Sequence, residues 1–384
     1  MQQKDVTLIL DDGSRFSGKS FGYEKPVAGE VVFNTAMTGY PESLTDPSYA
    51  GQLMTLTYPL VGNYGVPPFT IEADGIPTFM ESAKIHAEAI IVADYSEEYS
   101  HWNAKESLAE WLKREQIPGI TGIDTRALTK KLREHGVMMG RIVFEEVESG
   151  ELKVESYEDI NYVDRVSCKD IIVYAGGESH AYSIDTPTAE LNSQLSTFNS
   201  QQKKRVMLVD CGVKANIIRC LLKRGVEVIR VPWDYDFNGL EFDGLFISNG
   251  PGDPDTCDAA VQNIRKAMQN EKLPIFGICM GNQLLAKAGG ASVYKLKYGH
   301  RSHNQPVRME GTNRCFITSQ NHGYAVDNKT LGEDWEPLFT NMNDGSNEGI
   351  RHKRNAWFSA QFHPEAASGP TDTEFLFDEF VRLL

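Results

Sequence analysis

The sequence is poor in cysteine and gives it no repeated spacing. Its 384 residues hold six cysteines, without a CxxC pair and without a Cys/His pattern of the kind that binds metal. A disulfide framework and a structural zinc site are therefore not indicated. We also expect no phosphate-binding loop, and hence no metal and no cofactor held by this chain.

Positive charge and long apolar runs are scarce as well. The 38 lysines and arginines against 53 aspartates and glutamates give a formal net charge of −15, which argues against nucleic acid or an anionic membrane as a partner. No stretch approaches the roughly 20 apolar residues that cross a bilayer. The start of the chain resembles neither a signal peptide nor a transit peptide. We therefore expect a cytoplasmic protein.

The length and the apolar pattern indicate two domains. Residues 1–145 predict a compact α+β unit that opens with a β-hairpin and carries helices near 104–115 and 124–136. Residues 146–204 have less apolar content and predict an exposed connection. From 205 to 384, Val- and Ile-rich strands alternate with amphipathic helices, which indicates an α/β domain with a mainly parallel central sheet.

The most informative motif is Gly277-Ile278-Cys279-Met280-Gly281, which ends an apolar run and precedes a helix-forming segment. A strand, a sharp turn and a helix in this order are typical of a nucleophile elbow, here with cysteine as the nucleophile. The glycines leave room where a Cβ would clash. The unpaired N–H groups and the positive dipole end of the new helix favour a thiolate. Cys279 is therefore the candidate nucleophile.

A second motif, His363-Pro364-Glu365, supplies a candidate base. A free thiol is mostly protonated near neutral pH, so cysteine catalysis needs a base or a lowered pKa. In an extended segment the side chains of His363 and Glu365 point the same way. Glu365 would accept from one imidazole nitrogen, while the other nitrogen takes the proton of Cys279 and returns it to a leaving group. The two motifs together predict a Cys–His–Glu triad.

Backbone groups complete the candidate site. The amide of Met280 would serve an oxyanion hole. The loop 248–254 closes a strand at the carboxyl edge of the sheet, where α/β domains bind ligands. Gly250 and Gly252 would let the backbone of this loop approach a substrate. Three histidines in polar loops are expected to be exposed or to have supporting positions rather than to react: His300, His303 and His322.

With these motifs the chain resembles the class I, or triad, glutamine amidotransferases. The resemblance extends beyond the second domain. Over essentially the full chain the sequence is similar to the small, glutaminase subunit family of carbamoyl-phosphate synthase, in segments 29–35, 37–40, 44–49, 122–126, 248–254 and 319–324. The N-terminal segments are the specific part, because other amidotransferases share only the second domain.

This resemblance implies a reaction and a set of site residues. It implies that Cys279 attacks the side-chain amide of L-glutamine and forms a γ-glutamyl thioester. His363 would protonate the departing ammonia and then activate water, while Glu365 orients His363. Met280 and Tyr324 stand where leucine and phenylalanine are common, at contacts expected to be largely main-chain. The residues implied for glutamine binding are Ser48, Gly250, Gly252, Met280, Gln283, Asn321, Gly323 and Tyr324.

The resemblance also implies a partner. Ammonia that equilibrates with water near neutral pH is mostly ammonium, which cannot attack, so a useful glutaminase passes NH₃ along a dry path to a second site. A large subunit is expected to bind ATP and Mg and to make carbamoyl phosphate from bicarbonate, for arginine or pyrimidine biosynthesis. We expect a heterodimer in which the large subunit contacts mainly the first domain of this chain. Without its partner, the glutaminase is expected to be slow. The loop 299–306 differs from common bacterial versions and is assigned no chemistry.

Three other interpretations stay open. An amidotransferase subunit for another acceptor, such as chorismate or a nucleotide, usually lacks the first domain. A free-standing cysteine hydrolase, such as a γ-glutamyl hydrolase, would need no partner. A non-catalytic regulatory subunit is disfavoured by the intact Cys279, His363 and Glu365. Activity measured with and without an ATP-dependent partner separates these interpretations.

Overall fold

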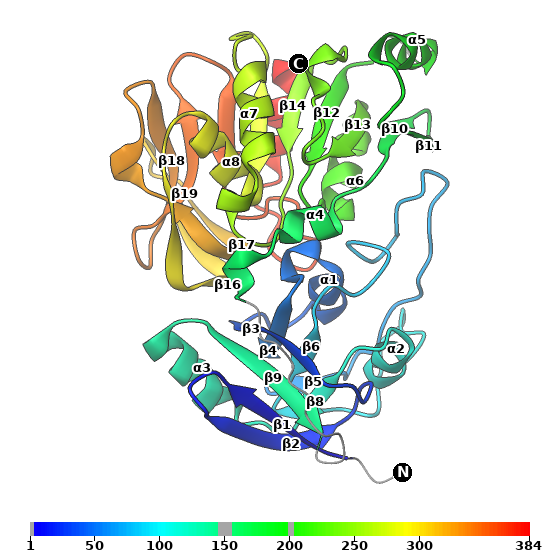
Figure 1. Cartoon of the computed structure of the whole chain (residues 1–384), viewed down its shortest axis with the longest axis vertical. Coiled ribbons are helices and arrows are strands. Elements are labelled where there is room, and N and C mark those ends of the chain that lie inside the picture. The colour runs from blue at the N-terminus through cyan, green and yellow to red at the C-terminus, as the bar shows by residue number, and fades with distance from the viewer. Residues whose placement is uncertain (1–3, 145–155, 199–202) are drawn as a thin grey trace. The chain divides into compact units, whose positions relative to one another are not determined.

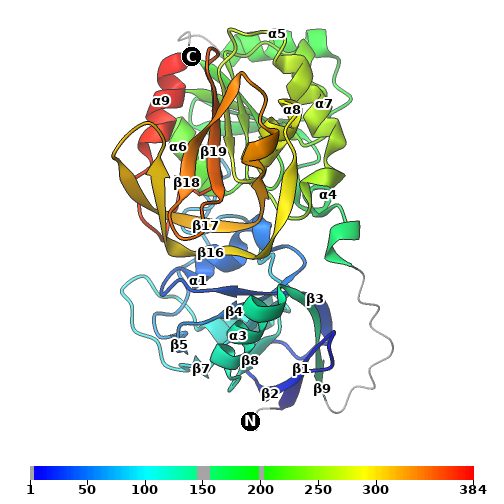
Figure 2. The same ribbon diagram turned by 90° about the vertical axis from the view of Figure 1, so that its left-hand side faces the viewer.

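The computed structural model describes residues 4–144, 156–198 and 203–384. Figures 1 and 2 show the chain from two directions. None of the described helices is both long enough and apolar enough to cross a membrane. The chain forms two compact units, the first from Met1–Thr70, Pro77–Ile160 and Lys297–Ser302, and the second from Ile71–Ile76, Asn161–Leu296 and His303–Leu384.

The first unit is built on a closed β-barrel. Seven of its described strands follow one another around the barrel in the order β1-β2-β8-β6-β4-β3-β9. The elements of this unit are β1 (Asp5–Leu10), β2 (Arg15–Ser20), β3 (Val27–Asn34), α1 (Tyr40–Thr45), β4 (Gln52–Leu56), β5 (Leu60–Val61), β6 (Ala89–Ile91), β7 (Asp94–Tyr95), α2 (Leu108–Arg114), β8 (Gly119–Thr121), α3 (Thr125–His135) and β9 (Met138–Phe144).

Local signals in the sequence explain the helices of this unit. Ser107 and Glu110 form a reciprocal capping box at the start of α2. Asp124 caps α3 by accepting from the amide of Ala127, and Gly136 ends that helix with a φ of 99°. The predicted hairpin is confirmed as β1 and β2, and both predicted helices are confirmed, although α2 begins later than the apolar pattern indicated.

Residues 13–20 carry the Gly-x-x-x-x-Gly-Lys-Ser spacing of a phosphate-binding loop, contrary to the expectation that the chain has none. In the structure they form a turn and the strand β2, which pairs with β1 and β8. The Lys19 ammonium donates to the carboxylate of Asp5 at 2.6 Å on an exposed face. A phosphate-binding loop leads into the N-terminus of a helix, so this segment is a barrel strand and not such a loop.

The second unit is an α/β domain with one large sheet. Its strand order is β11-β10-β13-β12-β14-β15-β20-β19-β18-β16-β17. The elements are α4 (Tyr162–Val166), β10 (Ile171–Ala175), β11 (Glu178–Tyr182), α5 (Thr188–Phe198), β12 (Arg205–Asp210), α6 (Ala215–Lys223), β13 (Glu227–Pro232), β14 (Gly244–Ile247), α7 (Asp258–Ala267), β15 (Ile275–Ile278), α8 (Met280–Ala288), β16 (Val293–Met309), β17 (Cys315–Val326), β18 (Trp335–Asn341), β19 (Asn347–His352), β20 (Trp357–Ala360) and α9 (Phe375–Leu383).

Helices cover both faces of this sheet (Figure 1). Neighbouring strands are parallel from β13 through β12, β14 and β15 to β20. One core lies under α5, α7 and α8, and another under α6 and α9. Strands buried on both faces must be apolar throughout, as residues 206–209 are. The α/β class with a mainly parallel central sheet is thereby confirmed.

The segment predicted to be an exposed connection is largely part of this domain. Strand β10 pairs with β13, and β11 extends the sheet by pairing with β10. Leu191 and Leu195 of α5 are buried in the core. An edge strand and a helix with one buried side need few apolar residues, so the polar composition of 176–198 was misleading. Residues 145–155 and 199–202 lie outside the described residues.

The aromatic cluster under α9 provides a test of this packing. Phe377 is fully buried, and its ring centre lies 5.8 Å from that of Phe246 in β14. We expect Phe377→Ala to lower the free energy of unfolding by about 3–5 kcal/mol, because the truncation leaves a cavity. Leu383→Ala, at a position 43% exposed on the same helix, should change it by no more than about 0.5 kcal/mol. Equal losses in denaturant unfolding would contradict the packing.

Candidate active site

Cys279 lies on a sharp turn between β15 and α8. Its φ of 55° and ψ of −104° fall in a region that non-glycine residues rarely adopt. A Cβ on Gly277 would lie 2.4 Å from the carbonyl oxygen of Gly281, and a Cβ on Gly281 would lie 2.1 Å from that of Ile247. Close packing therefore requires both glycines, while the unusual φ falls on the cysteine itself. The strand, turn and helix expected around Cys279 are present.

Strand β20 places the second motif next to this turn. It runs parallel to β15, with Ile278 opposite Ala360, and the amide of Cys279 donates to the carbonyl oxygen of Ala360 at 2.8 Å. Three residues further on, the amide of His363 donates to the carbonyl oxygen of Ser319 at 2.8 Å. The carboxyl ends of two neighbouring parallel strands thus carry Cys279 and His363, and both side chains are buried.

A buried carboxylate connects two cationic groups at this edge. One oxygen of Glu365, Oε1, lies 2.7 Å from His363 Nδ1 and 2.9 Å from Lys214 Nζ. Burial acts to raise the pKa of Glu365, but the Lys214 and His363 charges outweigh it and lower this pKa to about 2. Glu365 is therefore ionised near neutral pH and holds the Nδ1–H of the imidazole.

The same charges set the protonation state of His363. Burial and the Lys214 ammonium act to lower its pKa, whereas Glu365 and Cys279 act to raise it, and the net effect is a pKa raised to about 10. The ring is therefore an imidazolium near neutral pH. Its Nε2 is buried and makes no hydrogen bond with the described residues. The charged ring therefore has an Nε2 proton to offer to an incoming group. The Cys279 thiol donates to the carbonyl oxygen of Asn321 at 3.6 Å.

Lys214 is a site residue that the sequence patterns did not identify. Its amide donates to Asn249 Oδ1 at 3.1 Å. The turn that precedes it is shaped by the buried Asp210, whose carboxylate accepts from the amides of Gly212 and Val213 at 2.8 Å each. Its place in the sequence could have identified it as a site residue. Lys214 follows the first parallel strand of the domain, at the carboxyl edge of the sheet where α/β domains bind ligands.

Several predicted glutamine-binding residues are linked by hydrogen bonds around the turn. Gln283 in α8 donates from Nε2 to the carbonyl oxygen of Tyr324 at 3.3 Å. The Tyr324 hydroxyl donates to Asp253 in the loop 248–254 at 3.0 Å, a bond that phenylalanine at this position would lack. Asn321 and Gly323 precede Tyr324 on β17, and Met280 begins α8. Helix α8, strand β17 and this loop are therefore tied together beside Cys279.

The loop glycines meet different constraints. A Cβ on Gly250 would lie 2.1 Å from the carbonyl oxygen of Cys211, so no larger residue fits there. Gly252 has a φ of 86°, which favours glycine. Ser48 belongs to the first unit, where its amide donates to Asp46 Oδ1 at 2.9 Å. Its contact with glutamine stays a prediction.

The three histidines predicted to lie in polar loops, His300, His303 and His322, belong instead to the strands β16 and β17, and they are less exposed than their polar context indicated. His300 and His322 are buried. A ring nitrogen of His322 lies 2.8 Å from the carbonyl oxygen of Tyr324, which is a supporting position beside the candidate site. Burial, with the Lys214 and His363 charges, lowers the pKa of His303 to about 4, so its ring is neutral near neutral pH.

The charge on His363 predicts how stability depends on pH. Because the pKa of His363 rises on folding, from an ordinary value of 6.5 to about 10, its charge stabilises the folded chain fully below pH 6.5. This contribution is lost as the pH rises towards about 10. Glu365→Gln removes the carboxylate that raises this pKa. We expect the variant to lose less stability than the parent chain between these pH values, measured by thermal unfolding. A loss as steep as in the exposed control Glu333→Gln would argue against the buried ion pair.

Comparisons with known proteins define the class of this fold and site. Residues 207–383 match the family model for class-I glutamine amidotransferases. Residues 8–142 match the model for the CPSase domain of the carbamoyl-phosphate synthase small chain. The C-terminal half is thus a class-I amidotransferase domain, joined to an N-terminal domain typical of one kind of amidotransferase. The chain belongs to the carbamoyl-phosphate synthase small-chain family.

Individual relatives agree with this membership. The carbamoyl phosphate synthase arginine-specific small chain of Saccharomyces cerevisiae is 47% identical over 382 residues, which cover 98% of this chain and 87% of that protein. The corresponding chain of Aspergillus niger is 46% identical, with 98% and 79% covered. The multifunctional protein pyr1-3 of Dictyostelium discoideum is 48% identical over 394 residues, 99% of this chain but 17% of that protein. The chain therefore spans a small part of its multifunctional relatives.

Proposed function

We propose that this chain is the glutamine-hydrolysing part of a carbamoyl-phosphate synthase. The observation that supports this most strongly is the buried arrangement of Cys279, His363 and Glu365 at the carboxyl edge of an amidotransferase sheet. The family-specific N-terminal barrel distinguishes this function from that of an amidotransferase for another acceptor. The chain would convert L-glutamine to glutamate and ammonia.

The first half of the reaction is acylation of the cysteine. The sulfur of Cys279, as the thiolate, attacks the side-chain carbonyl carbon of glutamine, and the amide of Met280 donates to the oxyanion that forms. When the C–N bond breaks, the imidazolium of His363 gives its Nε2 proton to the nitrogen, which leaves as ammonia. The products of this half are a γ-glutamyl thioester and a neutral imidazole that is still bonded to Glu365.

The second half is hydrolysis of the thioester. Neutral His363 accepts a proton from water, whose oxygen attacks the thioester carbonyl, and glutamate leaves with regeneration of the thiolate and the imidazolium. Glu365 favours the charged ring and Lys214 opposes it, as the directions of their effects on the pKa of His363 indicate. A base must be able to lose its proton as well as hold it, so Lys214 would keep His363 from remaining permanently charged.

Glutamine would be held mainly by backbone groups. The backbone groups of Gly250 and Gly252 in the loop 248–254 and of Gly323 on β17 would contact it, together with Asn321 and Tyr324 on the same strand. The hydrogen bond from Tyr324 to Asp253 ties this strand to the loop. Gln283 would fix the wall formed by Tyr324. Ser48 would add a hydroxyl from the N-terminal unit, at a position within a family-typical segment.

The ammonia would be used by a large ATP-dependent partner chain. Small chains among the relatives imply such a partner, and the multifunctional relatives carry long additional sequence beyond the matched part. ATP and Mg would bind to the partner, where bicarbonate is converted to carbamoyl phosphate. The same product would serve arginine or pyrimidine synthesis.

Glutamine hydrolysis with and without the partner tests this proposal. We expect slow hydrolysis by the chain alone, faster hydrolysis with a large chain, ATP and bicarbonate, and formation of carbamoyl phosphate. Cys279→Ser should lower kcat by at least about 10³-fold, because an alcohol in this site is a far weaker nucleophile than a thiolate. Cys257→Ser, at another buried cysteine, is the matched control. A rate of glutamine hydrolysis that does not change when the partner, ATP and bicarbonate are added would indicate a free-standing hydrolase instead.

The role of Ser48 is tested separately. Loss of one hydrogen bond to a charged group of glutamine should raise KM about 10- to 100-fold in Ser48→Ala, with kcat changed much less. Ser43→Ala, in the preceding helix α1, should leave KM within about twofold, the effect expected for a position away from the site. An unchanged KM in Ser48→Ala would remove this residue from the proposed site.

A further inference from the structure

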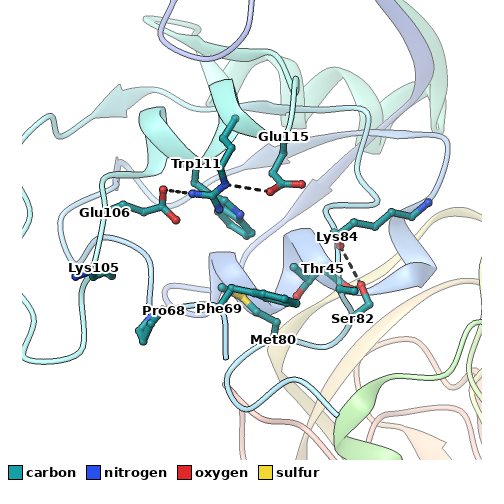
Figure 3. Close-up of a pocket in the computed structure, with 12 residues that line it drawn as sticks. Thr45, Pro68, Phe69, Met80, Ser82, Lys84, Lys105, Glu106, Trp111 and Glu115 are labelled. Carbon is teal, nitrogen blue, oxygen red and sulfur yellow. Dashed lines mark hydrogen bonds and ion pairs between the residues drawn. The ribbon is translucent and has the colours of Figure 1, made fainter. Parts of the chain in front are cut away.

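A cavity in the first unit has no part in the proposed reaction. Its volume is about 620 Å³, and it lies between α2, the end of α1 and residues 68–69 and 80–84 (Figure 3). All residues that line it belong to the first unit. Sites for small molecules commonly measure about 300–1,000 Å³, so this cavity has room for a ligand with one or two rings.

The walls of this cavity are aromatic and apolar. Trp111 of α2 and Met80 are almost fully buried beneath it, whereas Phe69 is 45% exposed. Figure 3 shows Trp111 and Phe69 on opposite sides of the opening. Aromatic side chains favour flat ring systems stacked or tilted against them. The walls therefore suit an aromatic ligand better than a sugar or a short peptide of polar residues.

Some of the charged side chains around the opening form ion pairs and others do not. Arg114 pairs with both Glu106 and Glu115, so these three groups together carry one net negative charge. Lys84 and Lys105 lie on opposite sides in Figure 3, where the Lys84 side chain extends away from Phe69 and Trp111. The described residues offer neither ammonium group an ion-pair partner. The five charged side chains around the opening leave one net positive charge in a chain of net charge −15, which favours a negatively charged ligand.

We propose that this cavity is a binding site for a small aromatic anion. The ring system lies between Phe69 and Trp111, and its carboxylate or phosphate lies beside Lys84 or Lys105. Binding removes apolar surface of Phe69 from water and supplies one of the two ammonium groups with a counter-charge.

An occupied cavity would also act on the segment that carries Ser48, an effect that rests on the proposed function. In the cavity wall, Ser82 Oγ donates to the carbonyl oxygen of Thr45 at 2.7 Å, and the amide of Glu81 donates to Thr45 Oγ1 at 3.0 Å. Thr45 is followed by Asp46, whose carboxylate accepts from the amide of Ser48. A ligand that orders this wall should lower KM for glutamine by about fivefold, at the lower end of usual coupling between sites.

Calorimetric titration of the full chain tests the site directly. The probes are 1-naphthyl phosphate, 1-naphthoate and the uncharged 1-naphthylmethanol. We expect affinity to fall in that order. Lys84→Glu combined with Lys105→Glu should weaken binding of the phosphate at least about tenfold, and Phe69→Ala should weaken all three probes. Lys113→Glu combined with Lys130→Glu, two exposed lysines outside the cavity, makes the same charge change and should leave affinity within about twofold.

Three results would overturn the site: no binding of either anion, equal affinity for the uncharged probe, or equal weakening by the control pair. Binding with the expected pattern but an unchanged KM for glutamine would overturn the link to Ser48. Calorimetry requires no turnover, so a failure of this site is distinguishable from a failure of the proposed glutaminase activity.

Discussion

The parallel pairing of β15 with β20 is the constraint on which the candidate site depends. It aligns Ile278 with Ala360, and the next residues along each strand lead to Cys279 and His363. The pairing holds only because Gly277 and Gly281 let the turn and the new helix pack against the sheet without a Cβ. Backbone geometry thus sets the positions of nucleophile and base before any side-chain interaction contributes.

The buried charges then determine what these side chains can do. Glu365 has to remain ionised in an environment that disfavours charge, and Lys214 and His363 together stabilise it. A buried carboxylate left with one partner would be costly. The arrangement therefore works as a unit of three charges, in which Lys214 permits Glu365 to hold His363 and also limits how strongly His363 keeps its proton.

Much of this was predictable from the sequence, for specific reasons. The elbow and the His–Glu pair are local patterns, since a strand end fixes where Cys279 points and an extended segment fixes the relation of His363 to Glu365. Lys214 was missed because it lies 151 residues before Glu365, between β12 and α6, and only the order of the strands in the sheet brings the two together. Residues 161–198 were misread because composition does not distinguish an edge strand from a connection.

The central claim is that Cys279 forms a covalent intermediate with glutamine. It is tested most directly by mixing the chain with glutamine, quenching in acid within the first turnovers and locating any adduct by peptide mass spectrometry. The account predicts one γ-glutamyl group on the peptide that contains Cys279, and its accumulation when Glu365→Gln slows hydrolysis of the thioester. Turnover of glutamine without an adduct, or an adduct on another cysteine, would contradict it.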